Sequence, residues 1–309
     1  MTSKVVGVTA VAFSRDQERI EYLRESFDGD VVINEKQVRF TPEELIPFLQ
    51  HCDYAIIGLD KITDDVLSQC PQLKVISKYG VGLDNIDFKA CAKHGVKVVY
   101  PKGVNKRSVS EEVLGASLSL LRNLYVTSNL LKKGEWLVQG GRQLTNTTFG
   151  IIGVGHIGKD LIEVLKPFNC ELLVNDIIEQ DAYYASVGAK AVSKEEIFQK
   201  CDVISIHTPL DEQTKHMVNT ETLAMMKSNA IIINAARGGI VDENALKRAL
   251  LDNKIAGAAL DVYEVEPAED KALLEIPNLM CMPHIGGNAK EAVVAMGMAA
   301  ITNLINAIE

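Results

Sequence analysis

Three side chains that suit proton transfer and anion binding follow apolar runs late in the chain: Arg237, Glu266 and His284. Histidine is the natural general acid and base near neutral pH, and a neighbouring carboxylate orients its ring and favours its protonated form. An arginine fork binds a carboxylate through two hydrogen bonds and polarises the carbonyl beside it. These residue types together indicate hydride transfer to a 2-oxo acid or from a 2-hydroxy acid, in which the substrate oxygen gains or loses a proton.

A glycine-rich motif lies upstream of these residues. The motif GVGHIG, residues 153–158, follows the apolar run Thr148–Ile152 and opens a segment with helical periodicity. The first glycine permits a tight turn, the second lets the backbone approach a pyrophosphate, and the third lets helix and strand pack closely. The helix N-terminus then offers free N–H groups and a partial positive charge to phosphates. The motif therefore predicts a dinucleotide site that includes Gly153, Gly155, His156, Ile157 and Gly158.

An acidic residue follows the motif at the spacing that a dinucleotide site requires. The next apolar run, Leu172–Asp176, ends in Asp176, eighteen residues after Gly158. A carboxylate at this place accepts hydrogen bonds from the ribose hydroxyls of an adenosine and repels a 2′-phosphate. No arginine or lysine stands at residues 177–179. The combination favours NAD over NADP.

Short β-branched runs alternate with segments of helical periodicity along nearly the whole chain. This alternation predicts doubly wound α/β layers, in which ligands bind at the carboxyl ends of parallel strands. The expected strands are Val5–Val8, Ala55–Gly58, Val75–Ser77, Val96–Val99, Thr148–Ile152, Leu172–Asp176, Val203–His207, Ala230–Asn234, Ala256–Leu260 and the apolar run Leu279–Pro283. The expected helices are Gln17–Ser26, Pro42–Gln50, Thr63–Gln69, Glu111–Leu131, Gly158–Lys166, Lys194–Gln199, Asn219–Met226 and Asn244–Leu251.

The length of 309 residues predicts about two domains. Pro101 and Gly103 precede a long helical pattern, Arg107–Leu131, and a Pro/Gly-rich stretch precedes a tail helix, Asn288–Ile308. If the tail helix packs back on the first domain, that domain is discontinuous. We therefore expect one domain at 1–100 plus 288–309 and another at 101–287.

Composition and charge exclude several classes of protein. A net charge of −9 argues against general binding to nucleic acid or anionic membranes. The longest strongly apolar stretch, Ala292–Ile301, is short for a membrane span, and the N-terminus reads as a first strand rather than a signal peptide. The six cysteines contain no CxxC pair, so we expect reduced thiols, no metal site and a cytoplasmic location.

Seven stretches spread over the chain carry a resemblance to a known family. The chain resembles the D-isomer-specific 2-hydroxyacid dehydrogenases, which include phosphoglycerate, D-lactate and glycerate/hydroxypyruvate enzymes. The matching stretches are KYGVGLDNID (78–87), NKRSVSEEVL (105–114), GVGHIG (153–158), HTPL (207–210), NAARGGIVDENAL (234–246), ALDVYEVEP (259–267) and PHIGGNAKEA (283–292).

The resemblance implies a role for each matched position. It implies a Rossmann NAD domain, a flavodoxin-like discontinuous substrate domain and a homodimer formed through the long helix after residue 105. It places the catalytic arginine, glutamate and histidine on Arg237, Glu266 and His284. The implied cofactor contacts also include Thr208, Pro209, Ala235, Ala236, Asp261 and Gly286, and the implied substrate contacts are Lys78, Gly80, Val81 and Gly82, with Arg237 and His284 in both sets.

Two departures from the family pattern affect the substrate and its regulation. The chain ends at Glu309, so we expect a short form without the C-terminal regulatory domain that many phosphoglycerate dehydrogenases carry. Lys78 stands where phosphoglycerate enzymes often have arginine, and Lys61 lies in the neighbouring loop. Either ammonium suits a substrate phosphate as a point charge, and the alternative is that both are merely solvated.

The sequence leaves the substrate and one rival function open. The expected substrate is 3-phosphoglycerate or an acid of the glycerate, hydroxypyruvate and glyoxylate type. The alternative is an NAD(H)-sensing, corepressor-like binding protein, because that branch of the family keeps the same three polar residues. Chemistry of the formate dehydrogenase type is disfavoured, because that branch pairs its histidine with glutamine and this chain has Glu266.

Overall fold

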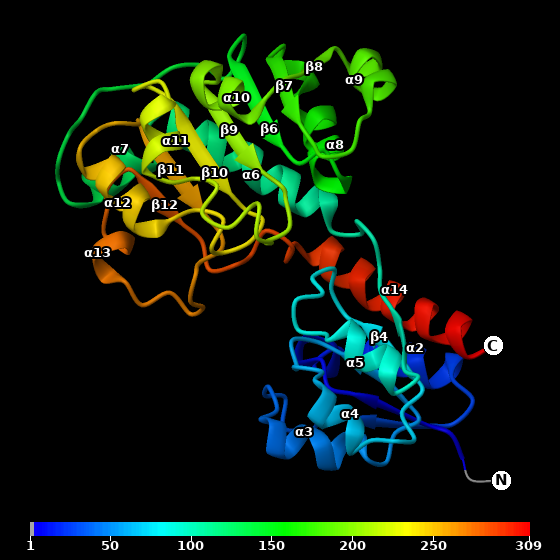
Figure 1. The fold of residues 1–309 in the computed structure, drawn as a ribbon. Coiled ribbons are helices and arrows are strands. Elements are labelled where there is room, and N and C mark those ends of the chain that lie inside the picture. Colours follow the sequence, from blue (N-terminus) through cyan, green and yellow to red (C-terminus); the bar gives the residue numbers. More distant parts are fainter. Residues whose placement is uncertain (1–2) are drawn as a thin grey trace. The chain divides into compact units, whose positions relative to one another are not determined.

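The computed structural model describes residues 3–309, which form two compact units (Figure 1). The first unit extends to Asn105 and includes Lys290–Glu309, and the second unit is Lys106–Ala289. The predicted division was 1–100 plus 288–309 against 101–287. The tail helix thus belongs to the first unit, which is discontinuous in sequence.

The first unit is a five-stranded parallel sheet in the order β2-β1-β3-β4-β5, which is the flavodoxin-like order. Two apolar clusters, one that includes Ile76 and one that includes Ile56, form its core. Its strands are β1 (Val5–Val8), β2 (Asp30–Ile33), β3 (Tyr54–Ile57), β4 (Val75–Lys78) and β5 (Lys97–Val99). Its helices are α1 (Val11–Ser14), α2 (Gln17–Ser26), α3 (Pro42–Leu49), α4 (Asp64–Ser68), α5 (Phe88–Lys93) and α14 (Lys290–Ile308).

The second unit is a seven-stranded parallel sheet in the order β12-β11-β10-β9-β6-β7-β8. The strand order reverses between β6 and β9, which creates the switch point where a Rossmann fold binds its ligand. Its strands are β6 (Thr148–Ile152), β7 (Glu171–Asn175), β8 (Ala189–Ala191), β9 (Val203–Ile206), β10 (Ile231–Asn234), β11 (Gly257–Leu260) and β12 (Leu279–Cys281). Its helices are α6 (Lys106–Leu121), α7 (Leu124–Lys132), α8 (His156–Leu165), α9 (Asp181–Val187), α10 (Lys194–Lys200), α11 (Thr220–Met225), α12 (Glu243–Leu251) and α13 (Lys271–Leu274), with a 3₁₀ turn at Lys166–Phe168.

The predicted fold class of two doubly wound parallel sheets is confirmed. The sequence patterns missed β2 and β8, because each is a short edge strand that is half-exposed and lacks a continuous apolar run. The single long helix predicted over Arg107–Leu131 is wrong. Asn123 adopts a left-handed conformation (φ 53°) and separates α6 from α7. Helix α6 buries seven residues in the second unit, whereas α7 buries none.

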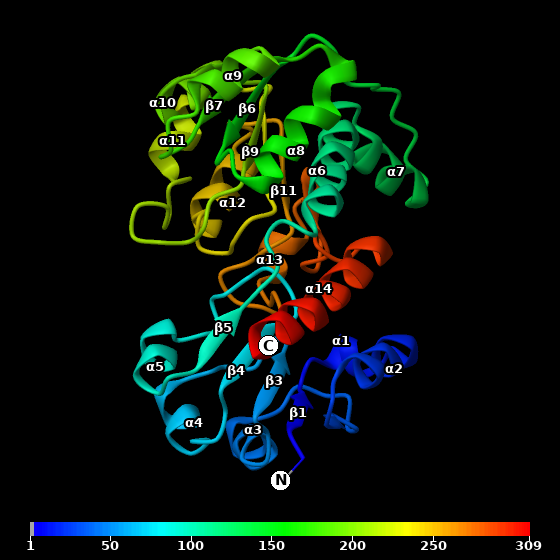
Figure 2. The ribbon, with the colours of Figure 1, turned by 90° about the vertical axis from the view of Figure 1, so that its right-hand side faces the viewer.

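Helix α14 is long and apolar enough to cross a membrane by length and composition, unlike any other helix of residues 3–309. From the sequence, we expected the stretch Ala292–Ile301 to be too short for a membrane span. The whole helix is longer, so its length and composition do not exclude a span. Its packing accounts for the apolar character, because α14 lies against β4, β5 and α2 of its own unit (Figure 2). Ala300, Ile301 and Leu304 are buried there, and the hydroxyl of Ser77 donates to the carbonyl of Ala300 at 2.7 Å.

We expect Leu304→Ala to destabilise the protein by about 2–5 kcal/mol, because it leaves a cavity beneath a helix that belongs to the core. Val294→Ala on the same helix is the matched control. Val294 is 46% exposed, so its truncation is expected to change stability by less than about 0.5 kcal/mol. Urea unfolding midpoints of the two variants measure the difference, and equal effects would contradict the packing role of α14.

Candidate active site

The glycine-rich motif joins β6 to α8 in the conformation that dinucleotide binding requires. Gly153 has φ +96°, and a Cβ there would lie 2.5 Å from the carbonyl oxygen of His207. A Cβ on Gly158 would collide with the carbonyl of Gly153. Gly155 differs, because a Cβ on this N-cap residue of α8 would meet no atom within 4 Å. Two glycines are therefore needed for packing, and the third borders open space at a helix N-terminus, where phosphates bind.

Asp176 directly follows β7, which ends at Asn175, one residue earlier than the predicted strand end. Its Oδ2 accepts a hydrogen bond from the N–H of Val154 at 2.5 Å, and its Oδ1 accepts one from Ile178 at 2.8 Å. The carboxylate is thus fixed beside the glycine-rich motif. Ile177 and Ile178 next to it are largely exposed, which leaves apolar surface of the kind an adenine ring covers.

The HTPL segment follows β9, the strand next to β6. His207 is half-buried, its Nε2 lies 2.9 Å from the hydroxyl of Ser205, and desolvation lowers its pKa to about 4. The contact with Ser205 joins His207 to the end of β9. Thr208 has a buried hydroxyl oxygen with no hydrogen-bond partner among the residues described.

The Arg237 loop follows β10 and is shaped by its neighbours. Asn234 donates from Nδ2 to the carbonyl of Arg237 at 2.9 Å and accepts from the N–H of Ala236 at 3.1 Å. The Arg237 guanidinium donates to the carbonyl of Ala236 at 2.7 Å. Gly238 touches the backbone after β11 so closely that a Cβ would overlap the carbonyl of Tyr263. The loops after β10 and β11 are therefore packed together.

His284 and Glu266 form a pair, as the sequence predicted. The His284 Nδ1 lies 2.8 Å from Glu266 Oε2, while Glu266 Oε1 accepts from the N–H of Tyr263 at 3.1 Å. The backbone of His284 has φ +55°, which turns the chain sharply after β12. The imidazole is about half-exposed, and Glu266 occupies its Nδ1.

Asp261, directly after β11, holds the loop that follows His284. Its two carboxylate oxygens accept hydrogen bonds from Ile285 at 2.7 Å and Gly286 at 2.8 Å. The sequence identified Asp261 and Gly286 only as cofactor contacts. It missed Asn234, which directly precedes the predicted Ala235 and Ala236, and Glu112 on α6, whose carboxyl group lies beside Asp261. A polar residue at the end of an apolar strand is a signal that would have found Asn234.

In the first unit, the turn Gly80–Gly82 follows β4, and Gly80 has φ +107°. Lys78 is only 2% exposed, and its ammonium donates to the carbonyl of Gly58 and to Asn85 Oδ1 at 2.9 Å. Lys61 is exposed. The idea that both lysines are merely solvated is wrong for Lys78, which holds the loop at Gly58. Its expected contact with a substrate phosphate stays a prediction, as do the contacts of Gly80, Val81 and Gly82.

The residues around the switch point fit a bound NAD. They combine open space at Gly155, the fixed carboxylate of Asp176 and the unpartnered hydroxyl of Thr208. Together, Gly155, Asp176 and Thr208 would hold the pyrophosphate, a ribose and another polar part of the dinucleotide. Within residues 3–309, no group of three or more His, Cys, Asp or Glu side chains is arranged to hold a metal ion. All six cysteines are free thiols, and burial raises the pKa of Cys201 to about 12.

Comparison with known proteins identifies the family. Residues 114–286 match the family model for the NAD-binding domain of D-isomer specific 2-hydroxyacid dehydrogenases. The chain is 38% identical over 261 residues to D-3-phosphoglycerate dehydrogenase of Methanocaldococcus jannaschii, and the match covers 83% of this chain and 50% of that protein. It is 32% identical over 285 residues to hydroxypyruvate reductase of Thermotoga maritima, covering 89% of this chain and 92% of the relative.

A solved structure gives the same result. The crystal structure of a glyoxylate reductase from Paecilomyes thermophila superposes with a TM-score of 0.87 at 27% identity, covering 100% of this chain and 96% of that one. The chain spans about half the length of the phosphoglycerate dehydrogenases it matches. Because the family model covers more than half of the chain and its motifs occupy the carboxyl edge of the seven-stranded sheet, the chain belongs to the D-isomer specific 2-hydroxyacid dehydrogenase family.

Proposed function

We propose that the protein is an NAD-dependent oxidoreductase that interconverts a D-2-hydroxy acid and its 2-oxo acid. The observation that carries this proposal is the 2.8 Å contact between His284 and Glu266, on the same sheet edge as the dinucleotide motif. A general acid held by a carboxylate beside a nucleotide site is the minimum that carbonyl reduction by hydride transfer needs.

We propose a separate task for each side chain. Glu266 accepts the hydrogen bond from Nδ1–H of His284, which fixes the tautomer, stabilises the imidazolium and leaves Nε2–H to protonate the carbonyl oxygen. Arg237 anchors the substrate carboxylate and polarises the carbonyl next to it. NAD(H), when bound, supplies or accepts the hydride. In the oxidative direction, neutral His284 takes the hydroxyl proton on Nε2.

The substrate class is drawn from the chemistry and from the family's named members. Relatives are named as phosphoglycerate dehydrogenase, hydroxypyruvate reductase and glyoxylate reductase. Each of the acids in these names carries an oxygen at C2. We propose 3-phosphoglycerate or an acid of the glycerate, hydroxypyruvate and glyoxylate type. A panel of these acids assayed for NADH oxidation at 340 nm identifies the substrate. Tight NADH binding without turnover of any of them would favour the corepressor-like alternative.

His284→Ala is expected to lower kcat by at least about a hundredfold while NADH binding is retained, because the general acid is lost and the dinucleotide motif is untouched. Turnover and NADH fluorescence titration measure the two properties. The matched control is His94→Ala in the first unit, where the imidazole lies 2.7 Å from Asp64 on the surface. Undiminished turnover by His284→Ala would refute the assignment.

Asp176→Ala is expected to weaken NADH binding and to narrow the preference for NADH over NADPH. The variant loses the acceptor for the ribose hydroxyls and the charge that repels a 2′-phosphate. Dissociation constants for both cofactors, measured by fluorescence, check this. Glu179→Ala, which removes an exposed carboxylate three residues away, is the control and is expected to leave both constants unchanged.

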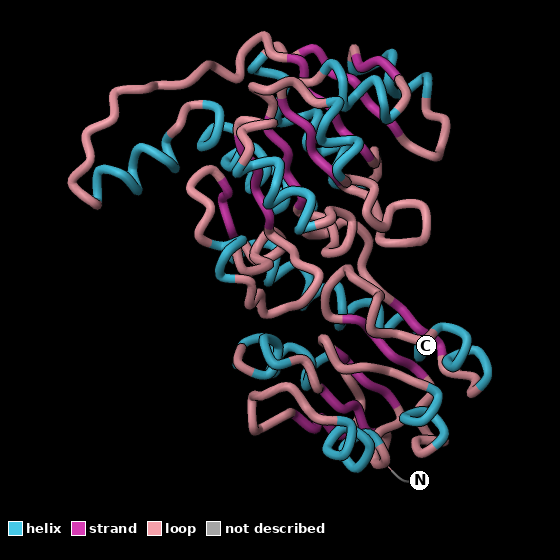
Figure 3. The backbone as a smooth tube through the Cα atoms, turned by 60° about the vertical axis from the view of Figure 1, so that its left-hand side comes forward, coloured by secondary structure: helices cyan, strands magenta, loops and turns pink. Residues whose placement is uncertain are grey.

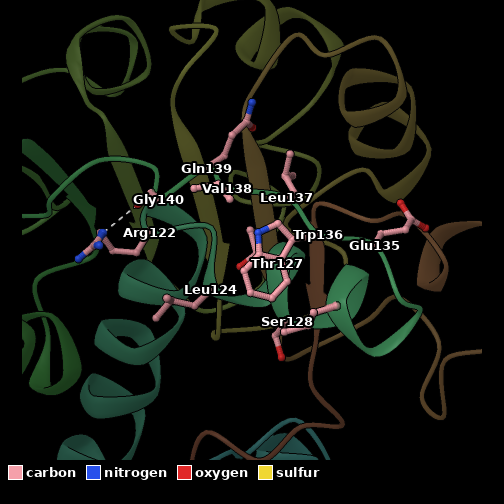
Figure 4. Close-up of a pocket in the computed structure, with 11 residues that line it drawn as sticks. Arg122, Leu124, Thr127, Ser128, Glu135, Trp136, Leu137, Val138, Gln139 and Gly140 are labelled. Atoms are coloured by element: carbon pink, nitrogen blue, oxygen red, sulfur yellow. Dashed lines mark hydrogen bonds between the residues drawn. The ribbon is translucent and has the colours of Figure 1, made fainter.

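We also propose that the protein is a homodimer, and that α7 and the loop after it form the contact. These residues hold a stretch of large exposed apolar side chains, among them Trp136 at 81%, Val138 at 82% and Leu131 at 54% exposure. Figure 3 shows the loop as a long irregular segment between α7 and β6. Trp136, together with Thr127 and Ser128 of α7, lines the pocket that these elements form (Figure 4). An apolar surface of this kind is typical of protein interfaces. Helix α6, in contrast, directs its apolar side chains into its own unit.

The double variant Trp136→Ser, Val138→Ser is expected to shift the protein from dimer to monomer, because it removes the apolar anchors of the contact. Light scattering after size-exclusion chromatography gives the mass of each species. Val38→Ser, at an exposed apolar residue of the first unit, is the control and is expected to stay dimeric. A wild-type monomer would contradict the proposal outright.

A further inference from the structure

Glu112 is a buried acid that the proposed reaction does not use. Both of its carboxyl oxygens are buried, and no hydrogen-bond donor reaches either of them in the part of the chain that the structure describes. An ionised carboxylate in such a place would raise the free energy of the folded state, because it loses its hydration and no hydrogen bond replaces it. Its neighbour is a second acid, Asp261, whose charge would repel that of Glu112.

The contacts of Asp261 indicate how the pair is arranged. Asp261 already accepts the N–H groups of Ile285 and Gly286, so it is the hydrogen-bond acceptor of the two. A protonated Glu112 can donate to one of its remaining lone pairs, which satisfies both acids and leaves one negative charge instead of two. Burial, and secondly the charge of Asp261, raise the pKa of Glu112 to about 8, which is consistent with a retained proton at neutral pH.

Helix α6 holds the loop after His284 at two points. Ser108, one turn before Glu112, donates from its hydroxyl to the carbonyl of Gly286 at 2.5 Å and accepts from the N–H of Ala289 at 3.1 Å. Gly286 packs so closely on Glu112 that a Cβ would collide with its carboxyl group. Residues four apart lie on one face of a helix. Ser108 and Glu112 therefore form a single surface on which residues 285–289 rest.

We propose that Glu112 is a positioning residue that, while protonated, donates a hydrogen bond to Asp261 and so fixes the loop that carries His284. Its effect on turnover rests on the proposed function, whereas its protonation does not. The other charged side chains of α6 and of the His284 loop have partners of their own or are exposed. Arg107 of α6 pairs with Asp160 of α8 at 2.8 Å, His284 pairs with Glu266, and Glu111 is exposed.

The first test measures the proton itself, without substrate. Folded Glu112 keeps its proton up to about pH 8, whereas an unfolded glutamate releases it near pH 4.5. Between these values folding takes up a proton, so this group makes the wild type less stable as pH rises. Glu112→Gln keeps a donor and takes up no proton. Its Tm is therefore expected to exceed that of the wild type by a margin that widens from pH 5 to pH 8 and is constant above.

The control for this test is Glu111→Gln, which removes the neighbouring exposed charge and is expected to show no such widening. A gap between Glu112→Gln and the wild type that is constant or narrows with pH would overturn the inference. That result would leave the proposed function intact, because the measurement uses no substrate or cofactor.

The second test measures positioning. With the substrate found in the panel, Glu112→Leu is expected to lower kcat at pH 7 by about tenfold, because Asp261 loses its donor. Glu112→Gln is expected to restore kcat and to lose less activity than the wild type above pH 8. His284 is present in both proteins, so the ratio of their kcat values, plotted against pH, reports the titration of Glu112 alone. Equal losses of kcat in the Leu and Gln variants would contradict the donor role. A wild type without turnover would refute the proposed function, and the Tm test would still decide whether Glu112 is protonated.

Discussion

The active edge of the second unit depends on Asp261, because this one carboxylate ties the ends of two strands together. It directly follows β11 and accepts the two N–H groups that come after His284 at the end of β12. His284 has a positive φ, which a non-glycine residue keeps only where its surroundings hold it. The contact of the imidazole with Glu266 is possible because the loop after β12 is fixed on one side by Asp261 and on the other by Ser108.

The same edge depends on close backbone approach at glycines. Gly238 lets the loop after β10 touch Tyr263, and Gly153 lets the loop after β6 touch His207. Each contact joins loops from neighbouring strands, so a side chain at either place would move a whole loop and not a single rotamer. The Arg237 loop thus depends on a main-chain contact, whereas Asp176 and Glu266 are held by hydrogen bonds of their own carboxylates.

Sequence patterns predicted the alternation of strands and helices, the parallel sheets and the discontinuous first unit. They did so because fully buried parallel strands such as Ile231–Asn234 read as continuous apolar runs. Edge strands such as Ala189–Ala191 lack that signal, since one side is exposed and the run is too short. The break at Asn123 was also missed, because the periodicity of the residues around it permits one continuous helix, whereas Asn123 takes a left-handed conformation that periodicity does not reveal.

The sequence by itself determined the chemical set: a glycine-rich motif, an acid eighteen residues later, and an arginine, a glutamate and a histidine after later strands. These are local patterns, and each follows from residue type and its place at a strand end. Only the tertiary structure decided that Lys78 is buried against Gly58 and that Glu112 lies beside Asp261. Both facts depend on which loops pack together across the sheet, and no spacing along the chain encodes the desolvation of a carboxyl group by residues far away in sequence.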